Sequence, residues 1–362
     1  MPIVNSEKDY KRYIDYLNKS PYTKFYQDPS WAKVKSNWTC DFVYVEEQNK
    51  QIVAAMTVLG IKNSNGKHFL YAPRGPVCDF TDYKLVDRLI KEAEPLKEKY
   101  DAFLLRIDPE LKFDERSVYE YKKMGYDFRS VCEPIHSFTQ PRYNMIVDLS
   151  LGDEDKIFKN FSSNGRYGIR KSIRSGIETK METNEKTLDK FYELTEIMAK
   201  RQEITYRPKE YFERLIKYMN GQIFTSYFED EALSASIIVP YKEKIMYLYA
   251  ASSNEKRNLM PNYNMLWEEI KYGIKNNFKE LDLGGVFSLD KKDGLYSFKE
   301  NFCYPNKYTA YIGELDVVCD WMLIMNFWLQ NKFKKIFKQI IILRANSILV
   351  CFFIYKKIAR LF

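Results

Sequence analysis

The first candidate for chemistry is Asp108, which closes the largely apolar segment "AFLLRID" and precedes a proline. An acidic residue at the C-terminal end of a buried strand lies at the mouth of a cleft, where α/β enzymes place their reacting groups. A carboxylate in that position can orient a nucleophile or accept its proton. An exposed carboxylate of ordinary pKa is a poor base for an ammonium group, which favours orientation. The structural alternative is an aspartate that caps a helix.

The second candidate is the pair Phe298-Lys299 in the aromatic-rich segment "YSFKENF". The face of an aromatic ring can stack on an unpaired nucleobase, and a neighbouring cation can meet a phosphate. A lysine in a cleft can also stabilise a developing oxyanion. The nearby pair Gly284-Gly285 lacks the spacing of a nucleotide-binding loop, so we expect it to end a strand where close backbone approach opens a cleft.

The elements that must position these residues occur twice along the chain. An apolar strand, a second strand, an amphipathic helix and a short buried strand recur in that order, at offsets of about 180 residues. The matching positions are Ile52 and Leu233, Phe69 and Met246, Tyr83 and Tyr263, and Phe103 and Glu280. A near-constant offset through four elements predicts an internal duplication.

Each copy has the order of elements of an N-acetyltransferase-like (GNAT-like) domain. We therefore predict an α/β fold, a tandem pair of GNAT-like acyltransferase domains with mixed sheets, and a cleft where parallel strands splay apart. The predicted domains are residues 1–144, completed by about 310–325, and residues 145–309. A basic, apolar, helical tail is expected over residues 326–362.

The chain lacks the loop that binds acyl-CoA, which is the usual donor substrate of such domains. Acetyltransferases hold the CoA pyrophosphate at a helix N-terminus with an Arg-x-x-Gly-x-Gly/Ala loop. In the matching segment "KRNLMPNYNML", Met260 and Asn262 occupy the small positions that follow Arg257. Bulky side chains block close approach of the backbone to phosphates, so the fold indicates acyl transfer without this donor.

Cysteine and histidine are too sparse for the common metal and triad chemistries. The six cysteines are scattered without a CxxC pair and there are two histidines, which disfavours a zinc site or a Ser-His-Asp triad. The chain is 45% hydrophobic and 16% aromatic, which indicates a folded protein with a large core. The start of the sequence lacks an apolar signal core, so we expect a cytoplasmic protein with reduced thiols.

The formal net charge of +8 lies in the C-terminal tail. Residues 331–362 hold eight of the 57 basic residues and no acidic one, which leaves 49 basic and 49 acidic residues in 1–330. Basic clusters around short apolar runs are typical of a helix in the interface of an anionic membrane. The alternatives are a helix packed on the body, a partner interface, or a spanning helix. The longest uncharged run, 345–355, is shorter than the roughly twenty residues that a span needs.

Seven segments together carry a family resemblance. They are "QDPSWAKVKSNW", "AFLLRIDPE", "QPRYNMIVDLS", "ITYRPKEYF", "KIMYLYAASS", "LDLGGV" and "YSFKENF". In this order they resemble the Fem family of non-ribosomal peptidyltransferases (the FemX, FemA, FemB and MurM type) from about residue 3 to 318. No long charged heptad insertion is present, so we expect the compact form without a helical arm, closest to FemX.

The resemblance implies an aminoacyltransferase that builds the peptidoglycan interpeptide bridge. Its donor is an aminoacyl-tRNA, and its acceptor is the stem-peptide amine of UDP-MurNAc-pentapeptide or lipid II. No metal or redox cofactor is implied. The alternatives are a GNAT-type enzyme that uses acyl-CoA and a non-catalytic adaptor that binds tRNA or membrane. We expect a monomer that is peripheral on the inner face of the cell membrane through its tail.

Site residues follow from the resemblance position by position. Lys35, from "WAKVK", and Arg207, from "YRP", match the cations that clamp the nucleotide diphosphate. Asp108 and Lys299 are the predicted catalytic residues. The cleft tyrosines, expected to contact the stem peptide or the donor ester, are Tyr211, Tyr247 and Tyr249. Tyr247 and Tyr249 are expected on one face of a strand, and a packed aromatic stripe is the structural alternative.

The tRNA is expected to meet a second group of residues. Phe298-Lys299 matches an aromatic–lysine pair that the family uses at the single-stranded 3′ end. The acceptor stem is expected on a basic segment with Arg170 and Lys171, which also contains Lys159, Arg166 and Arg174. A solvated basic helix explains this segment equally well.

Overall fold

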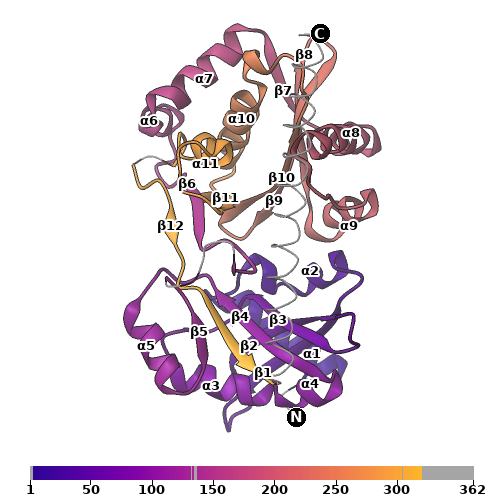
Figure 1. Ribbon diagram of the computed structural model, residues 1–362, viewed down its shortest axis with the longest axis vertical. Coiled ribbons are helices and arrows are strands. Elements are labelled where there is room, and N and C mark those ends of the chain that lie inside the picture. The colour runs from indigo at the N-terminus through magenta and orange to yellow at the C-terminus, as the bar shows by residue number, and fades with distance from the viewer. Residues whose placement is uncertain (1–2, 132, 134–136, 304, 320–362) are drawn as a thin grey trace, which may run out of the picture.

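The chain forms two lobes, each built on its own β-sheet, in the computed structural model of Figure 1. The structure describes residues 3–131, 133, 137–303 and 305–319. The predicted tail over 326–362 and the predicted return segment beyond 319 lie outside the described residues. Within the described residues, no helix is both long enough and apolar enough to cross a membrane.

The first lobe holds a six-stranded sheet in the order β1-β2-β3-β4-β13-β5. Its strands are β1 (Thr39–Glu46), β2 (Ile52–Lys62), β3 (His68–Arg74), β4 (Ala102–Pro109), β5 (Asp127–Arg129) and β13 (Glu314–Val318). Its helices are α1 (Glu7–Lys19), η1 (Phe25–Gln27), α2 (Pro29–Val34), α3 (Tyr83–Glu92), α4 (Glu94–Lys99) and α5 (Glu115–Lys123). Strands β3 and β4 are parallel, and the other neighbouring strands are antiparallel.

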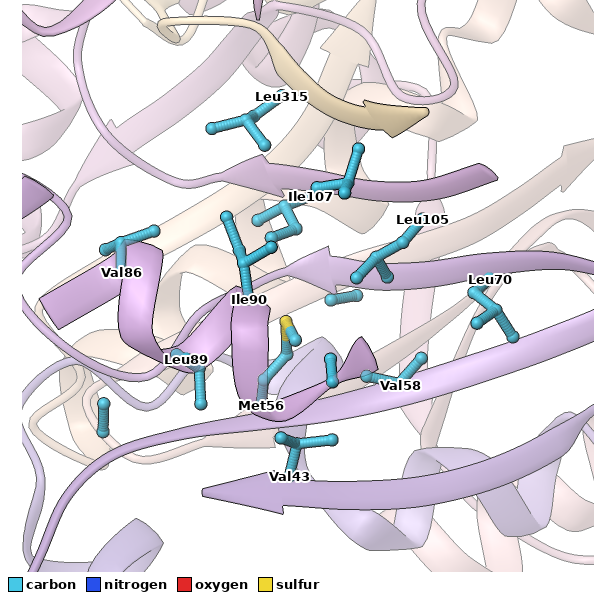
Figure 2. Close-up of a cluster of buried hydrophobic side chains, with 14 of the residues drawn as sticks. Val43, Met56, Val58, Leu70, Val86, Leu89, Ile90, Leu105, Ile107 and Leu315 are labelled. Atoms are coloured by element: carbon cyan, nitrogen blue, oxygen red, sulfur yellow. The ribbon is translucent and has the colours of Figure 1, made fainter. Parts of the chain in front are cut away.

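An apolar layer fills the space between this sheet and α3 (Figure 2). Val86, Leu89 and Ile90 recur at helical spacing on α3, and each is nearly inaccessible to solvent. They belong to one buried cluster with strand residues such as Met56 and Leu105. Full burial of a side chain of this size stabilises the fold by about 1.5–3 kcal/mol, so this layer fixes the strands that carry the site.

The second lobe holds a seven-stranded sheet in the order β12-β6-β11-β10-β9-β8-β7. Its strands are β6 (Tyr143–Asp148), β7 (Ile177–Met181), β8 (Gln222–Phe228), β9 (Glu231–Tyr241), β10 (Lys244–Ser252), β11 (Glu280–Val286) and β12 (Thr309–Ala310). On one face lie α6 (Glu154–Asn160), α7 (Ser163–Arg174), α10 (Pro261–Lys275) and α11 (Gly294–Lys299) (Figure 1). On the other face lie α8 (Glu185–Gln202) and α9 (Lys209–Met219), and η3 (Arg257–Leu259) precedes α10.

The predicted duplication is present in the two sheets. Strands β1 to β4 with helix α3 repeat as strands β8 to β11 with helix α10. Both sets have three antiparallel strands, a crossover helix and a fourth strand parallel to the third. The longest helix among the described residues, α8, has 18 residues, so that part of the chain contains no long helical arm. The predicted domain boundaries remain predictions.

The two copies differ at the ends of their parallel strands. In the first sheet, β3 and β4 stay paired up to Arg74 and Pro109. In the second, the ladder between β10 and β11 stops after Met246 pairs with Asp282. Beyond that point β10 continues along β9, and β11 continues along β6. The predicted splay therefore occurs in the second lobe, and it leaves an opening between the strand ends.

The chain returns to the first lobe through β13, which inserts between β4 and β5. Arg106 on β4 donates two hydrogen bonds to the Asp316 carboxylate, at 2.7 and 2.6 Å. Glu314 forms ion pairs with Arg129, at 2.6 Å, and with Arg106, at 3.2 Å. All four side chains are buried, so each charge depends on its partners. The Thr139 N–H also donates to Glu314, which ties the segment between the lobes to this network.

Side-chain caps fix where the helices begin. The capping residues include Ser6, Asp28, Asp82, Asp114, Asp153, Ser162, Asn184 and Asp293. Each accepts a hydrogen bond from a backbone N–H of the first turn, a contact that typically contributes about 1 kcal/mol. Asp293 matters for the site, because it begins α11, the helix that ends at Lys299.

Candidate active site

A cleft between the two lobes contains two connected cavities. We call the cavity of about 200 Å³ the Lys299 chamber and the cavity of about 340 Å³ the Lys35 chamber, each after a lysine that lines it. Tyr26, Gln140 and Leu248 line both cavities, so the chambers are parts of one cleft. The Lys299 chamber lies at the opening between β10 and β11.

Two cations from different lobes line the Lys35 chamber. Lys35 follows α2 in the first lobe, and Arg207 lies just before α9 in the second. The Lys35 ammonium lies 5.1 Å from the centre of the Trp31 ring, and both cations lie 5.5 Å from the centre of the Tyr211 ring. Burial, and secondly repulsion by Arg207, lower the pKa of Lys35 to about 8.

Neither Lys35 nor Arg207 forms an ion pair with any residue that the structure describes. Two neighbouring positive charges that lack a carboxylate partner favour a polyanionic ligand. The structure therefore brings together the two cations that were predicted to clamp a diphosphate.

The predicted cleft tyrosines divide between the chambers. Tyr249 lines the Lys35 chamber, and its hydroxyl donates to the Tyr211 hydroxyl at 2.9 Å. The expectation that Tyr247 and Tyr249 share one face of β10 is wrong. A bulge lies between them, so Tyr247 pairs with Ile238 and Tyr249 with the adjacent Ile237. Tyr247 consequently packs under α10 and lines the Lys299 chamber, whereas Tyr249 packs under α8 and α9.

Lys299 enters its chamber from the end of α11 and is 6% exposed. Its ammonium donates to the Gly285 carbonyl at 3.2 Å. Burial lowers the pKa of Lys299 to about 8, and the Asp282 carboxylate opposes this shift. Gly284 has a φ of +74° and donates its N–H to Asp282 Oδ1 at 2.8 Å. A Cβ on Gly285 would lie 2.3 Å from Pro141 Cβ, so both glycines are required for this turn.

Asp108 lies at the end of β4, as predicted, but in a buried setting. Its side chain is 2% exposed. Its Oδ2 accepts from the Tyr71 hydroxyl at 2.7 Å, and its Oδ1 accepts from the Arg74 N–H at 2.6 Å. The Arg74 guanidinium forms an ion pair with it at 3.8 Å. Burial raises the pKa of Asp108, which the Arg74 charge opposes. The expected exposed carboxylate of ordinary pKa is therefore wrong, and so is the helix-cap alternative.

Asp108 lines neither chamber itself, but its hydrogen-bond partners do. Tyr71 lines the Lys35 chamber and Arg74 lines the Lys299 chamber, whereas Asp108 is absent from the described lining residues of both. Asp108 thus holds one side chain of each chamber in place.

The predicted tRNA residues lie on two neighbouring helices. The Phe298 ring packs at 5.1 Å from Tyr263 and at 5.4 Å from Phe302, and it remains partly exposed. Arg170 and Lys171 lie on α7, away from the described lining of both chambers. The start of α7 is joined to the residues that follow Lys299, because the Ser162 N–H donates to the Asn301 carbonyl at 2.9 Å.

Sequence reasoning missed Asp282, Arg74 and Asn144, which line the Lys299 chamber. A signal existed for Asp282, because "LDLGG" ends a buried strand just as "AFLLRID" does. Arg74 follows the strand "FLYAP" in the same manner. Nothing local marked Asn144, which reaches the site because β6 pairs with β11.

The fold and cleft define a tandem acyltransferase-like protein whose site opens where β10 and β11 part. The chain belongs to the FemAB family, which it matches over residues 6–226 and 221–323. It is 35% identical over 329 residues to the UDP-N-acetylmuramoylpentapeptide-lysine N(6)-alanyltransferase of Weissella viridescens, which covers 88% of this chain and 97% of that protein. It is 23% identical over 398 residues to the lipid II:glycine glycyltransferase of Staphylococcus haemolyticus, with coverage of 88% and 92%.

Solved structures show the same architecture. A crystal structure of FemX matches with a TM-score of 0.76 at 19% identity, covering 90% of this chain and 99% of that one. A tandem GNAT protein from the clavulanic acid biosynthesis pathway matches with a TM-score of 0.54 at 8% identity, covering 87% and 98%. The predicted family, the tandem GNAT-like fold and the enzyme class, an aminoacyltransferase, are confirmed by these relatives.

Proposed function

We propose that this enzyme transfers an amino acid from an aminoacyl-tRNA to the stem-peptide amine of a peptidoglycan precursor, a step in building the interpeptide bridge. The relatives named as an alanyltransferase and as glycyltransferases support this reaction. The observation that carries the proposal is one cleft with two chambers of different chemistry. One presents two cations to a polyanion, and the other presents a buried lysine to a reacting group.

The acceptor occupies the Lys35 chamber. Lys35 and Arg207 bind the diphosphate that joins the sugar to its uridine or lipid carrier, because two converging cations suit two linked phosphates. Tyr249, supported by the hydroxyl of Tyr211, adds a polar contact to the sugar or peptide. We take the UDP-linked form as the acceptor, since the relative at 35% identity is named for it.

The donor reaches the Lys299 chamber from α11 and α7. Phe298 offers a partly exposed aromatic ring to the terminal base, and Arg170 and Lys171 offer charge to the acceptor stem. The two helices are joined near the chamber, because the Ser162 N–H at the start of α7 donates to the carbonyl of Asn301, two residues after Lys299.

Lys299 stabilises the oxyanion that forms when the amine attacks the ester carbonyl. Its cation acts in a largely buried site, where such stabilisation is strong, and its ammonium is held by a hydrogen bond to the Gly285 carbonyl. Asp108 contributes by orientation, since its carboxylate fixes Arg74 and Tyr71, one in each chamber. We propose no metal or redox cofactor for these steps.

The C-terminal tail attaches the cytoplasmic enzyme to the inner face of the membrane. This proposal rests on its eight basic residues among apolar runs. Deletion of residues 331–362 is expected to reduce co-sedimentation with vesicles that contain anionic phospholipid, and to leave transfer to a UDP-linked precursor unchanged. Equal sedimentation of the truncated chain would contradict the proposed role of the tail.

Ligand-induced thermal stabilisation tests the choice of substrate class. UDP-MurNAc-pentapeptide is expected to raise the melting temperature of the protein, because it binds the folded state alone, and CoA is expected to leave it unchanged. Stabilisation by CoA without stabilisation by the precursor would favour the acyl-CoA alternative.

A further inference from the structure

Asp282 is the carboxylate that faces the reacting position of the Lys299 chamber. It lies on β11 at the last residue paired with β10, and it is 2% exposed. It accepts hydrogen bonds from the Gly284 N–H at 2.8 Å and from the Asn144 Nδ2 at 3.2 Å. Both donors are uncharged amides. Among the described residues Asp282 forms no ion pair, although the charges of Lys299, Lys244 and Arg74 act on it from longer range.

The other two carboxylates near the chamber, Glu110 and Asp108, already have a cationic partner and a hydroxyl donor. Glu110 accepts from Lys244 at 2.7 Å and from the Tyr311 hydroxyl at 3.1 Å. Asp108 is held by Tyr71 and by Arg74. A cationic ligand therefore gains most from Asp282.

Asn144 provides a second acceptor at the same place. It is 5% exposed, and its Oδ1 has no hydrogen-bond partner in the part of the chain that the structure describes. A buried acceptor that lacks a donor is costly, so a ligand that supplies one is favoured. A primary ammonium carries three N–H donors and a positive charge, and it matches a carboxylate beside an amide oxygen.

We propose that Asp282, with Asn144, binds the attacking amine of the acceptor and accepts its proton. This assignment deepens the proposed function and rests on it. The general base is thereby placed on β11 of the second lobe, and Asp108 keeps a positioning role in the first.

The proton balance of the step is complete with the groups present. The bound ammonium gives one proton to the Asp282 carboxylate and becomes a neutral amine. Its nitrogen then forms a bond to the ester carbonyl carbon of the aminoacyl-tRNA, and the resulting oxyanion is met by Lys299. The bond from that carbon to the ribose oxygen breaks, and this oxygen takes the second proton of the nitrogen. The products are an amide and a free ribose hydroxyl, and Asp282 later releases its proton to solvent.

The charges around Asp282 suit this exchange. Burial, followed by the Glu110 charge, raises the pKa of Asp282, which makes it a stronger base than an exposed carboxylate. The Lys299 cation in the same chamber disfavours a second cation and helps the amine lose its proton. The titratable groups that face Asp282 are Tyr26, Arg74, Glu110, Lys244, Lys299, Cys303 and Tyr311.

Single-turnover transfer rates at different pH values test the assignment in the full-length chain. The assay uses UDP-MurNAc-pentapeptide with alanyl-tRNA or glycyl-tRNA, whichever the unmodified enzyme accepts. For the unmodified enzyme, the transfer rate is expected to be independent of pH just below pH 8, because Asp282 removes the proton from the attacking amine. Asp282→Asn is expected to be slower by about 100-fold and to gain about tenfold per pH unit, since only the free amine then reacts. Precursor affinity should also fall, because the bound ammonium loses its carboxylate partner.

Asp108→Asn is the matched comparison, and its profile is expected to stay flat. If the unmodified enzyme yields no product with any charged tRNA, the proposed function fails. If it is active and Asp282→Asn keeps a flat profile, the role of Asp282 is wrong while the function stands. A steep profile in Asp108→Asn alone would return the base to Asp108.

Asn144→Ala covers the case in which Asp282→Asn does not fold. It leaves the carboxylate in place but removes a hydrogen bond that stabilises its charged form, so the acid limb of the rate profile should move to higher pH. An acid limb that does not move would overturn the assignment.

Discussion

The ammonium of Lys35 and the guanidinium of Arg207 come from different lobes, yet each lies 5.5 Å from the centre of the Tyr211 ring. The two lobes meet at this point, where α2 packs against α9 and Arg214 donates to the Val34 carbonyl at 3.2 Å. Like charges in a half-buried site repel, and this repulsion contributes to the lowered pKa of Lys35. We expect a diphosphate bound at this place to relieve the repulsion and so to couple acceptor binding to the contact between the lobes.

Removal of either cation should weaken acceptor binding rather than slow the chemical step. For Lys35→Ala and Arg207→Ala we expect the KM for UDP-MurNAc-pentapeptide to rise by about 10–100-fold, because a hydrogen bond to a charged group is worth about 1.5–3 kcal/mol. Lys33→Ala, which removes an exposed lysine from the same helix, is the control and should have a normal KM. Steady-state kinetics measure both. A normal KM in Lys35→Ala and Arg207→Ala would remove the proposed diphosphate site.

The pKa of Lys299 should appear in the pH dependence of transfer. Burial lowers this pKa to about 8, and only the protonated lysine stabilises the oxyanion, so the rate should fall as the pH rises above about 8. Lys299→Met should lose about 10²–10³-fold in kcat, the usual effect of deleting an oxyanion donor. Lys299→Arg keeps its charge at all accessible pH values, so whatever activity it retains should lack the alkaline decline. A decline at the same pH in Lys299→Arg would assign that limb to another group.

The same burial predicts an effect on stability. The folded pKa of Lys299 is about 8 and the ordinary value is 10.5, so the unfolded chain binds the extra proton between these values and stability rises with pH across that window. Below about pH 8 the cost of burying the charge is fully present. Lys299→Met should therefore be more stable at pH 7, by on the order of 3 kcal/mol, with a smaller gain at higher pH. Urea unfolding at several pH values measures the difference. A destabilised Lys299→Met at pH 7 would contradict this prediction.

The bulge in β10 predicts different outcomes for two tyrosines that are two residues apart. Tyr249→Phe removes the hydroxyl that bonds to Tyr211 in the Lys35 chamber, so it should raise the precursor KM by about 3–10-fold, the effect of one neutral hydrogen bond. Tyr247→Phe alters the opposite face of the strand and should leave this KM unchanged. Equal effects of the two variants on the precursor KM would show that the bulge does not separate their roles.

Much of the fold could be predicted because the sequence repeats the same order of strands and helices. The repeat of an apolar strand, a second strand, a helix and a buried strand is visible in the sequence, and it becomes β2, β3, α3 and β4 and then β9, β10, α10 and β11. The splay of one parallel pair also follows from this order. Its occurrence in the second lobe alone depends on β6 and β9 drawing β11 and β10 apart, which is a long-range property.

The site was only partly predictable, for two physical reasons. A bulge inserts one residue without a marked local signal, so the face of Tyr247 could not be read from alternation. Burial of Asp108 depends on Tyr71 and Arg74, which approach from a neighbouring strand. Lys35, Arg207 and Lys299 were predicted from the ordered set of motifs, and they line the cleft, whereas Asp282 was overlooked in favour of the adjacent glycines.

One product analysis tests the central claim most directly. The purified chain is incubated with charged tRNAs and with UDP-MurNAc-pentapeptide or lipid II, and the mass of the precursor is measured. The proposed function predicts a precursor heavier by one amino-acid residue, with the new amide on the stem-peptide amine and a dependence on intact aminoacyl-tRNA. An unchanged precursor mass with every charged tRNA, under conditions in which the folded protein binds the precursor, would contradict it.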